Sequence, residues 1–142
     1  MTRRSLLLYL DASAVVKLVL LERESVALRT AVSAARLATS ELVLAEVPRA
    51  LARVRANATA RARFRHESQR VLEGLDLVPL GRPLLSSSAR LGPPRLRTLD
   101  AIHVASALAF ASDLEAFVSY DRRQLEAAGD AGLRVISPGA AH

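Results

Sequence analysis

Short apolar runs alternate with longer segments of helical periodicity along this chain, and this alternation limits the fold more than any other sequence feature. Apolar runs bounded by turn residues predict buried strands, and apolar residues repeated every three or four positions predict amphipathic helices. Strands that alternate with helices form βα units around a parallel sheet, so we expect an α/β fold. The expected strands are residues 6–10, 37–38, 77–80, 115–120 and 133–136, and the expected helices are about 13–21, 25–35, 40–54, 59–75, 82–91, 98–111 and 122–128.

Capping and breaking residues set the expected ends of two of these helices. Thr39 or Ser40 is expected to cap the helix that follows, because both hydroxyls accept hydrogen bonds from the free N–H groups of a first turn. Leu44 is expected on the buried face of that helix, and Pro48 is expected to kink it. Thr98 is expected to cap the later helix, whose many small side chains and lack of a polar face predict deep burial.

The length and composition indicate one domain with a core of its own. The chain has 142 residues, of which 51% are hydrophobic, and a chain of this size needs no cross-links to fold. It has no cysteine, which excludes disulfides, thiolate metal sites and thiol nucleophiles. The net charge is +6 and every basic residue except Lys17 is arginine, which suits a polyanionic partner. A scattered positive charge, however, is more often a solvated surface than a binding patch.

The N-terminal region has a weak likeness to a secretion signal. Arg3 and Arg4 precede an apolar run, but Asp11 ends that run after six residues, which is shorter than the apolar part of a signal peptide. Lys17 and Asp100 interrupt the most apolar segments, so no stretch reaches the length of a membrane span. We therefore expect a soluble protein of the cytoplasm.

Three aspartates, Asp11, Asp100 and Asp121, lie at or near the first turn of an expected helix. Asp11 and Asp121 directly follow expected strands, and open parallel sheets bind ligands beyond the carboxyl ends of their strands. Aspartate is also a favoured N-cap, so capping explains each residue taken alone equally well. Asp100 differs, because Thr98 already offers a cap and a carboxylate in an apolar helix needs a partner.

Glu46 lies in the middle of an expected helix, beside the apolar face, where no capping role exists. A salt bridge with Arg49 or Arg53, on the same side of the helix, would explain it without a catalytic role. If Glu46 and the three aspartates meet at one edge of the sheet, their negative charges repel one another unless a cation joins them. Hard divalent ions such as Mg²⁺ and Mn²⁺ prefer oxygen ligands of this kind.

Four spaced motifs carry a resemblance to a known family. They are YLDASAVVK at residues 9–17, LAEVPRAL at 44–51, LRTLDAIHVASA at 96–107 and VSYDR at 118–122, followed by GLRVISP at 132–138. In this order they resemble the PIN-domain ribonucleases, and specifically the VapC-type toxins of type II toxin–antitoxin systems. The resemblance covers nearly the whole chain, although residues 56–95 carry little family signal.

The resemblance implies a fold, a reaction and partners. The implied fold is a single PIN domain over residues 1–142, a three-layer α/β/α sandwich with a central parallel sheet. The implied reaction is hydrolysis of RNA phosphodiester bonds, leaving a 5′-phosphate and a 3′-hydroxyl, with Mg²⁺ as cofactor and Mn²⁺ able to replace it. The implied partners are an RNA substrate, a cognate antitoxin protein and a second copy of the chain in a homodimer. The implied catalytic and metal-binding residues are Asp11, Glu46, Asp100 and Asp121, of which the first and third are expected to bind metal directly.

Ser13, Arg49 and Arg53 are further candidates for contacts with the substrate. Ser13 follows the first strand, where its hydroxyl suits a phosphate or a metal-bound water, and equally a hydrogen bond at the start of the helix. Arg49 and Arg53 belong to a set of arginines on two consecutive helices that are expected to steer the RNA backbone. Phe64, in the same set, suits a stacked base, a core contact or a dimer contact. His103 is expected to be satisfied inside its helix rather than to bind metal.

Other folds and functions fit the sequence less well. A haloacid-dehalogenase-like phosphatase needs a second aspartate two residues after the first, where this chain has Ser13. A response-regulator receiver needs a lysine after a late strand, and the one lysine is Lys17. A nucleotide-binding fold needs a glycine-rich loop after the first strand, where Asp11 is followed by no glycine. The alternative that remains is a catalytically silent PIN-like domain that binds RNA or a protein partner and uses its carboxylates as caps and salt bridges.

Overall fold

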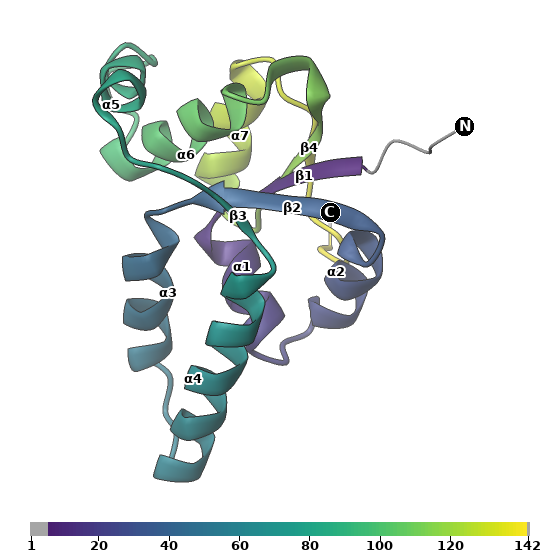
Figure 1. The fold of residues 1–142 in the computed structure, drawn as a ribbon. Helices are drawn as coiled ribbons and strands as arrows, with labels where there is room; N and C mark the ends of the chain where they lie inside the picture. The colour runs from purple at the N-terminus through teal and green to yellow at the C-terminus, as the bar shows by residue number, and fades with distance from the viewer. Residues whose placement is uncertain (1–5, 142) are drawn as a thin grey trace.

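The computed structural model describes residues 6–141, and in this part of the chain a parallel sheet lies between two layers of helices (Figure 1). The sheet has five strands in the order β3-β2-β1-β4-β5, and every neighbouring pair is parallel. This arrangement confirms the α/β fold with a central parallel sheet. The strands are β1 (Leu6–Leu10), β2 (Ala35–Ser40), β3 (Asp76–Val78), β4 (Leu114–Val118) and β5 (Val135–Ile136).

The helices divide between the two faces of the sheet. One face is covered by the first four helices along the described chain, and the other face by the last three (Figure 1). A 3₁₀ turn at Ala111–Asp113 leads into β4. The first group is α1 (Ala12–Val19), α2 (Ser25–Val32), α3 (Val43–Ala52) and α4 (Ala58–Glu73), and the second is α5 (Arg82–Ala89), α6 (Thr98–Leu108) and α7 (Arg122–Asp130).

The central strand β1 supplies side chains to a separate core on each face of the sheet. Leu8 and Leu10 belong to the core beneath α1 to α4, whereas Leu7 and Tyr9 belong to the core beneath α6 and α7. Successive side chains of a strand point to opposite faces, so a strand covered on both faces must be apolar throughout. This is why Leu6–Leu10 reads as a continuous apolar run, and its expected bounds agree with the structure.

The expected caps of α3 are wrong, because β2 runs further than the sequence suggests. Thr39 and Ser40 are the last residues of β2, and the N-cap of α3 is Leu42, which makes no side-chain capping bond. The Ser40 hydroxyl instead accepts from the Leu42 N–H at 3.1 Å, two residues along the chain and just before the helix starts at Val43. Because α3 starts at Val43, the side chain of Val43 points into the core and that of Leu44 is 49% exposed. Leu44 therefore does not lie on the buried face of the helix.

Other boundaries differ in smaller ways. Thr98 is the first residue of α6 rather than its cap, and Arg97 occupies the N-cap position without a side-chain bond. Ala35 begins β2 rather than ending α2. Helix α3 continues through Pro48 as far as Ala52. Seven residues of α6 are buried, so the deep burial expected from its small side chains agrees with the structure.

No helix among residues 6–141 is both long enough and apolar enough to span a bilayer.

Two leucines at opposite ends of β1 provide a matched test of the double core. Leu10 is 0% exposed and Leu6 is 52% exposed. Leu10→Ala should lower the free energy of unfolding by about 2–5 kcal/mol, because it removes buried methyl groups and leaves a cavity. Leu6→Ala should change it by no more than about 0.5 kcal/mol. Urea unfolding followed by circular dichroism measures both values, and equal losses would contradict the burial of β1 described above.

Candidate active site

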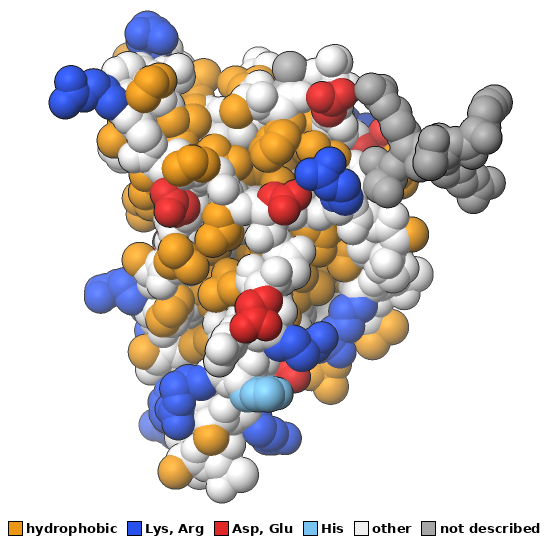
Figure 2. Space-filling view, viewed as in Figure 1, with side chains coloured by type: hydrophobic (Ala, Val, Ile, Leu, Met, Phe, Trp, Pro, Cys, Tyr) orange, Lys and Arg blue, Asp and Glu red, His pale blue; other side chains and the backbone are white. Residues whose placement is uncertain are grey.

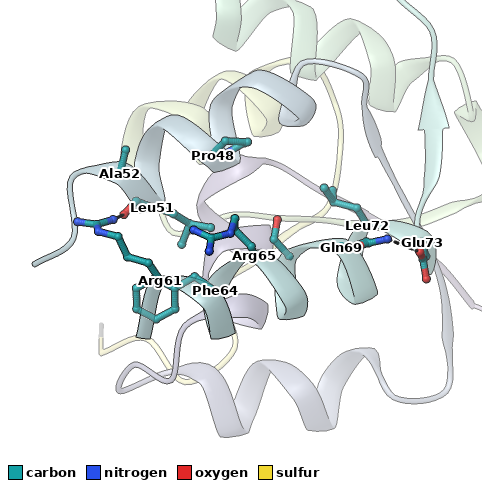
Figure 3. A pocket seen from close by; sticks show the side chains of 10 residues that line it. Pro48, Leu51, Ala52, Arg61, Phe64, Arg65, Gln69, Leu72 and Glu73 are labelled. Atoms are coloured by element: carbon teal, nitrogen blue, oxygen red, sulfur yellow. Dashed lines mark hydrogen bonds between the residues drawn. The ribbon is translucent and has the colours of Figure 1, made fainter. Parts of the chain in front are cut away.

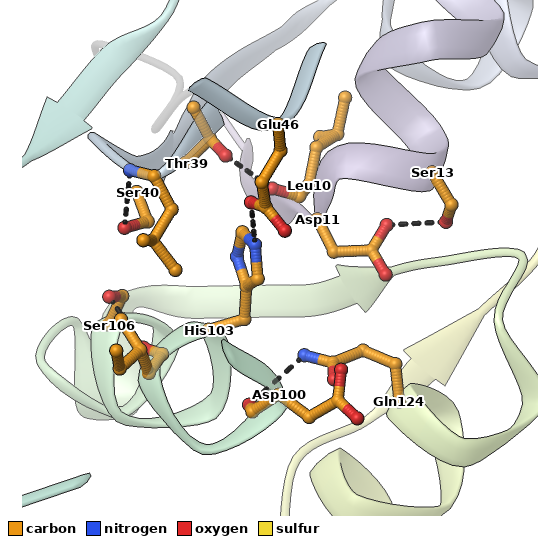
Figure 4. Close-up of polar contacts among 12 residues, drawn as sticks. Leu10, Asp11, Ser13, Thr39, Ser40, Glu46, Asp100, His103, Ser106 and Gln124 are labelled. Atoms are coloured by element: carbon orange, nitrogen blue, oxygen red, sulfur yellow. Dashed lines mark hydrogen bonds and ion pairs between the residues drawn. The ribbon is translucent and has the colours of Figure 1, made fainter. Parts of the chain in front are cut away.

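The pairing of β1 with β4 brings two separate parts of the sequence to one edge of the sheet. Leu10 lies opposite Val118 in the parallel ladder, and the Asp11 N–H extends the pairing by donating to the Val118 carbonyl at 3.2 Å. The residues that follow the two strands therefore meet, as expected from the rule that carboxyl ends of parallel strands share an edge. Side chains from α3 and α6 reach the same region (Figure 4).

Asp11 is buried, with 4% of its surface exposed, and three donors hold its carboxylate. Ser13 donates to Oδ1 at 2.6 Å, Ser119 donates to Oδ2 at 2.5 Å, and the Ala14 N–H donates to Oδ1 at 3.1 Å. Burial raises the pKa of Asp11, and the hydrogen bonds from Ser119 and Ser13 partly oppose this rise. Asp11 is thus both the N-cap of α1 and a buried acid at the edge of the sheet.

The two serines join the loop after β4 to the start of α1. Besides donating to Asp11, the Ser13 hydroxyl accepts from the Tyr120 N–H at 2.9 Å, and the Ser119 hydroxyl accepts from the Asp121 N–H at 3.0 Å. The hydrogen bond expected for Ser13 at the helix start is therefore present. Ser119 was missed by the sequence analysis, although its place directly after a strand and two residues before Asp121 is a usable signal.

His103 connects Glu46 to the interior of the protein. Its Nε2 lies 2.7 Å from Glu46 Oε1 and its Nδ1 lies 2.8 Å from the Tyr9 hydroxyl, and the ring is 3% exposed. A carboxylate accepts hydrogen bonds, so Nε2 carries the proton that points to Glu46. Burial raises the pKa of Tyr9, so its hydroxyl keeps its proton and donates to Nδ1. His103 is satisfied as expected, but its partners lie on other elements.

Glu46 does not form the salt bridge that was considered as its non-catalytic role. Glu46 forms no ion pair with Arg49 or Arg53, and among the described residues it pairs with His103. Arg49 and Arg53 are exposed and make no side-chain hydrogen bond within residues 6–141. The helix bearing Glu46 is therefore attached to α6 through the imidazole, and its arginines remain available to solvent.

Asp100 and Asp121 form the other part of the site, from α6 and from the start of α7. Burial raises the pKa of Asp100, and the negative charge of Asp121 raises it further, while the charges of Arg123 and Arg97 lower it. Asp121 caps α7 by accepting from the Arg123 N–H at 3.0 Å. The Asp100 carboxylate makes no hydrogen bond with the described residues. Two close carboxylates without a cationic partner on either oxygen are a site of excess negative charge.

Gln124 lies on α7 and contacts the backbone of Asp100, and the sequence analysis did not single it out. It is 1% exposed, and its Nε2 donates to the Asp100 backbone carbonyl at 3.3 Å (Figure 4). Its Oε1 is the one buried side-chain polar atom without a hydrogen-bond partner in the described part of the chain. Because a polar residue inside a helix is usually exposed, nothing in the local sequence marks it.

The donor set suits a hard divalent cation in chemistry, although it is not arranged as a closed metal site. Among residues 6–141, no group of three Asp, Glu or His side chains lies close enough to hold a metal ion without rearrangement. Both oxygens of Asp11 are bonded to serines and one oxygen of Glu46 is bonded to His103. The carboxylates are oxygen donors with unbalanced negative charge, which is what Mg²⁺ or Mn²⁺ would neutralise. The shared metal site therefore stays a prediction.

Comparison with known proteins decides the family. The PIN domain profile matches residues 8–130. The chain belongs to the PIN-domain family. It is 39% identical to Ribonuclease VapC47 of Mycobacterium tuberculosis over 140 residues, which cover 94% of this chain and 98% of that protein. It is 40% identical to Ribonuclease VapC46 of the same species over 132 residues, which cover 92% of this chain and 97% of that protein. The resemblance to PIN-domain, VapC-type proteins is confirmed.

Two solved structures share the fold of this PIN domain. A chain in the structure of FitAB bound to an IR36 DNA fragment superposes with a TM-score of 0.72 at 13% sequence identity, covering 95% of this chain and 97% of that one. The crystal structure of PAE2754 from Pyrobaculum aerophilum gives a TM-score of 0.62 at 23% identity, covering 92% of this chain and 83% of that one. At these identities the likeness concerns the fold alone.

The raised pKa of Asp100 predicts how stability depends on pH when no divalent ion is present. A carboxyl whose pKa is higher in the folded than in the unfolded chain holds more protons when folded, so stability falls as the pH rises through the folded pKa. Asp100→Asn should remove this loss and raise the free energy of unfolding at neutral pH by less than about 1 kcal/mol, because solvent screens a half-buried group. Urea unfolding in EDTA at acidic and neutral pH measures the effect.

Asp76→Asn is the control for this prediction. Asp76 is exposed and pairs with Arg36 at 2.9 Å, so its loss should give no gain in stability at neutral pH. An Asp100→Asn variant that is no more stable than wild type at neutral pH would contradict the cost of holding a half-buried Asp100 charge close to Asp121.

Proposed function

We propose that this PIN-domain protein is a Mg²⁺- or Mn²⁺-dependent ribonuclease that hydrolyses RNA phosphodiester bonds and acts as the toxin of a toxin–antitoxin pair. The observation that supports the proposal most is the collection of carboxylates at the carboxyl edge of the sheet: Asp11 after β1, and Asp100 close to Asp121. Similarity to two proteins named ribonucleases, over nearly the full length of all three, supports the reaction class.

The residues proposed to hold the cation are Asp11, Asp100, Glu46 and Asp121. When bound, a divalent cation supplies charge neutralisation for the phosphate and an acidified water as nucleophile. Ser13 and Ser119 fix the orientation of the Asp11 carboxylate, and His103 fixes Glu46 by one oxygen. The other Glu46 oxygen makes no hydrogen bond with the described residues, which leaves it able to accept a proton or to orient a water.

Replacement of single carboxylates tests the proposed reaction. Asp11→Asn and Asp100→Asn should each reduce Mn²⁺-dependent cleavage of single-stranded RNA by more than about 100-fold, because each removes a charged metal ligand. Asp76→Asn, an exposed aspartate outside the site, should cleave like wild type. The rate of cleavage of a labelled RNA at equal protein concentration measures all three, and full activity of Asp11→Asn or Asp100→Asn would contradict the assignment.

Metal binding can be followed without any reaction. A ligand that binds only the folded state at a hundredfold excess over its Kd stabilises by about 2.7 kcal/mol. Mn²⁺ should therefore raise the Tm of the wild-type protein, and should raise the Tm of Asp100→Asn less. A catalytically silent PIN-like domain that binds RNA or a partner would show RNA binding with no response of Tm to Mn²⁺, which would favour that alternative.

Arg49 and Arg53 remain proposed contacts of the RNA backbone. Arg49 lies on α3, the helix that carries Glu46, and Arg53 is the C-cap of that helix. Both are exposed, and their side chains are free of ion pairs within the described residues. Unpaired arginines beside an acidic site suit a polyanion that must approach it. Phe64 fits its core role better than a base-stacking role, because it packs partly against the core beneath α1 to α4.

The partner proposed for the toxin role is an antitoxin protein that lies in an apolar groove between α3 and α4 (Figure 3). The groove has a volume of about 700 Å³, and Pro48, Leu51, Phe64 and Leu72 form much of its wall. Hydrophobic side chains are exposed over these two helices, and basic side chains lie toward the far end of α4 (Figure 2). An exposed apolar groove of this kind suits the apolar face of a partner helix.

A charge placed in the groove tests the partner proposal. Ala52 is exposed and lines the groove, so Ala52→Glu should weaken the complex with the cognate antitoxin by at least about tenfold, since binding in an apolar groove would strip water from the new charge. Ala62→Glu, on an exposed part of α4 outside the groove, is the control. Calorimetric titration measures both affinities, and both variants should retain RNA cleavage. Equal affinities would contradict docking in this groove.

A homodimer and a location in the cytoplasm remain expectations. Support for a dimer comes from three exposed leucines on adjoining helices. Helix α6 contacts α3 through His103 and Glu46, and it packs against α5. These leucines are Leu44 on α3, Leu85 on α5 and Leu99 on α6. We likewise keep as a proposal that residues 1–142 form a single domain.

A further inference from the structure

A second pocket opens at the acidic edge of the sheet, and Asp100 is the one member of the proposed carboxylate set that lines it. We call it the Asp100 pocket. Its volume is about 230 Å³, and its walls come from the segment before α6 and from one side of α7. The residues that line it are Pro93, Arg95, Leu96, Arg97, Asp100, Arg123, Glu126, Ala127 and Asp130.

Two arginines, Arg97 and Arg123, line the end of the pocket nearest the site. Arg97 and Arg123 line the same pocket as Asp100, and Arg97 is the N-cap residue of the helix that carries Asp100. Both side chains are exposed, and neither makes a hydrogen bond or ion pair with the described residues. Guanidinium groups that are unpaired and close to an acidic centre are free to bind an external anion.

Helix α7 sets the order of charged and apolar side chains along one wall of the pocket. Arg123, Ala127 and Asp130 are spaced by four and three residues, so they lie along one side of the helix. With a rise of about 1.5 Å per residue, they span about 10 Å. Arg123 is two residues from Asp121 and so lies at the site, whereas Asp130 is the last residue of α7 and lies at the far end. Along α7, the wall of the pocket therefore changes from positive at Arg123 to negative at Asp130.

The middle of the pocket is apolar. Pro93 and Leu96 contribute apolar surface from the segment before α6, and Ala127 contributes a small side chain from α7. A positive end, an apolar middle and an acidic far end match the order of groups in a nucleotide. The phosphate is anionic, the faces of the base are apolar, and the edge of most bases carries N–H donors.

We propose that the Asp100 pocket binds one nucleotide of the RNA, next to the bond that is cleaved, with its phosphate at Arg97 and Arg123 and its base edge at Glu126 and Asp130. This inference rests on the proposed function, because it names the part of the RNA that the same site takes. Two carboxylates accept from the exocyclic amino groups of adenine, guanine and cytosine. Uracil has no amino group, and its single N3–H donor stands between two carbonyl oxygens that a carboxylate repels, so the pocket disfavours uridine.

Binding without cleavage tests the phosphate end. Anisotropy of a fluorescein-labelled single-stranded RNA in EDTA gives the affinity over a range of salt concentrations. Arg97→Gln and Arg123→Gln should each flatten the slope of log affinity against log salt by about 0.7, the value for one phosphate contact on a single strand. Arg90→Gln is the matched control, since Arg90 is exposed, carries the same charge and does not line the pocket. Slopes equal to that of Arg90→Gln would overturn the phosphate contact.

The base end is tested by the sequences that are cleaved. Wild-type protein with Mn²⁺ should cleave a random RNA pool with uridine depleted at one position beside the cut. Ala127→Met, which fills the pocket without changing charge, and the double variant Glu126→Gln with Asp130→Asn should lose this depletion and keep preferences at other positions. An unchanged profile in both would overturn the inference. If the wild-type protein showed no Mn²⁺-dependent cleavage, the proposed function would be contradicted instead. The salt dependence of RNA affinity in the Arg97→Gln and Arg123→Gln variants would then still test the phosphate contact in the pocket.

Discussion

The parallel pairing of β1 with β4 is the constraint on which the site depends. Leu10 and Val118 lie opposite each other, so the chain leaves both strands at the same edge. The first polar residue after β1 is Asp11, and the first after β4 is Ser119, which donates to it. A slip of one residue between the strands would turn every side chain to the other face of the sheet, and two covered faces make such a slip costly. The apolar cores thus set the geometry of the polar site.

Around this edge the protein holds its acids in two different ways. Asp11 is buried and compensated by neutral donors, whereas Asp100 is half-buried, without donors and close to a second negative charge. Neutral hydrogen bonds orient a carboxylate without removing its charge, and close carboxylates favour a cation between them. This combination agrees with a nuclease site that is organised by the fold and completed by an ion. Glu46, held by His103, adds a third element to the same region.

Much of the fold was predictable because its signals are local. The apolar run of β1 depends on neighbours within a few residues, and its bounds could be predicted from residue type alone. The errors at Thr39, Ser40 and Leu44 arose because β2 continues through two hydroxyl residues that resemble helix caps. Thr39 is fully buried, and its hydroxyl donates to the Leu10 carbonyl at 2.6 Å, a partner 29 residues away. A side chain whose hydrogen bond crosses to another strand cannot be told from a cap by its own segment.

The sequence alone determined the alternation of strands and helices, the family motifs and the identity of the acidic residues, because each is encoded in residue type and short spacing. Tertiary structure decided which partners those residues have. It joined Glu46 to His103 rather than to Arg49 or Arg53, brought Ser119 to Asp11, and left a cavity between α6 and α7 beside Asp100. Such contacts depend on how helices pack across a sheet, and packing sums many weak interactions that no single segment contains.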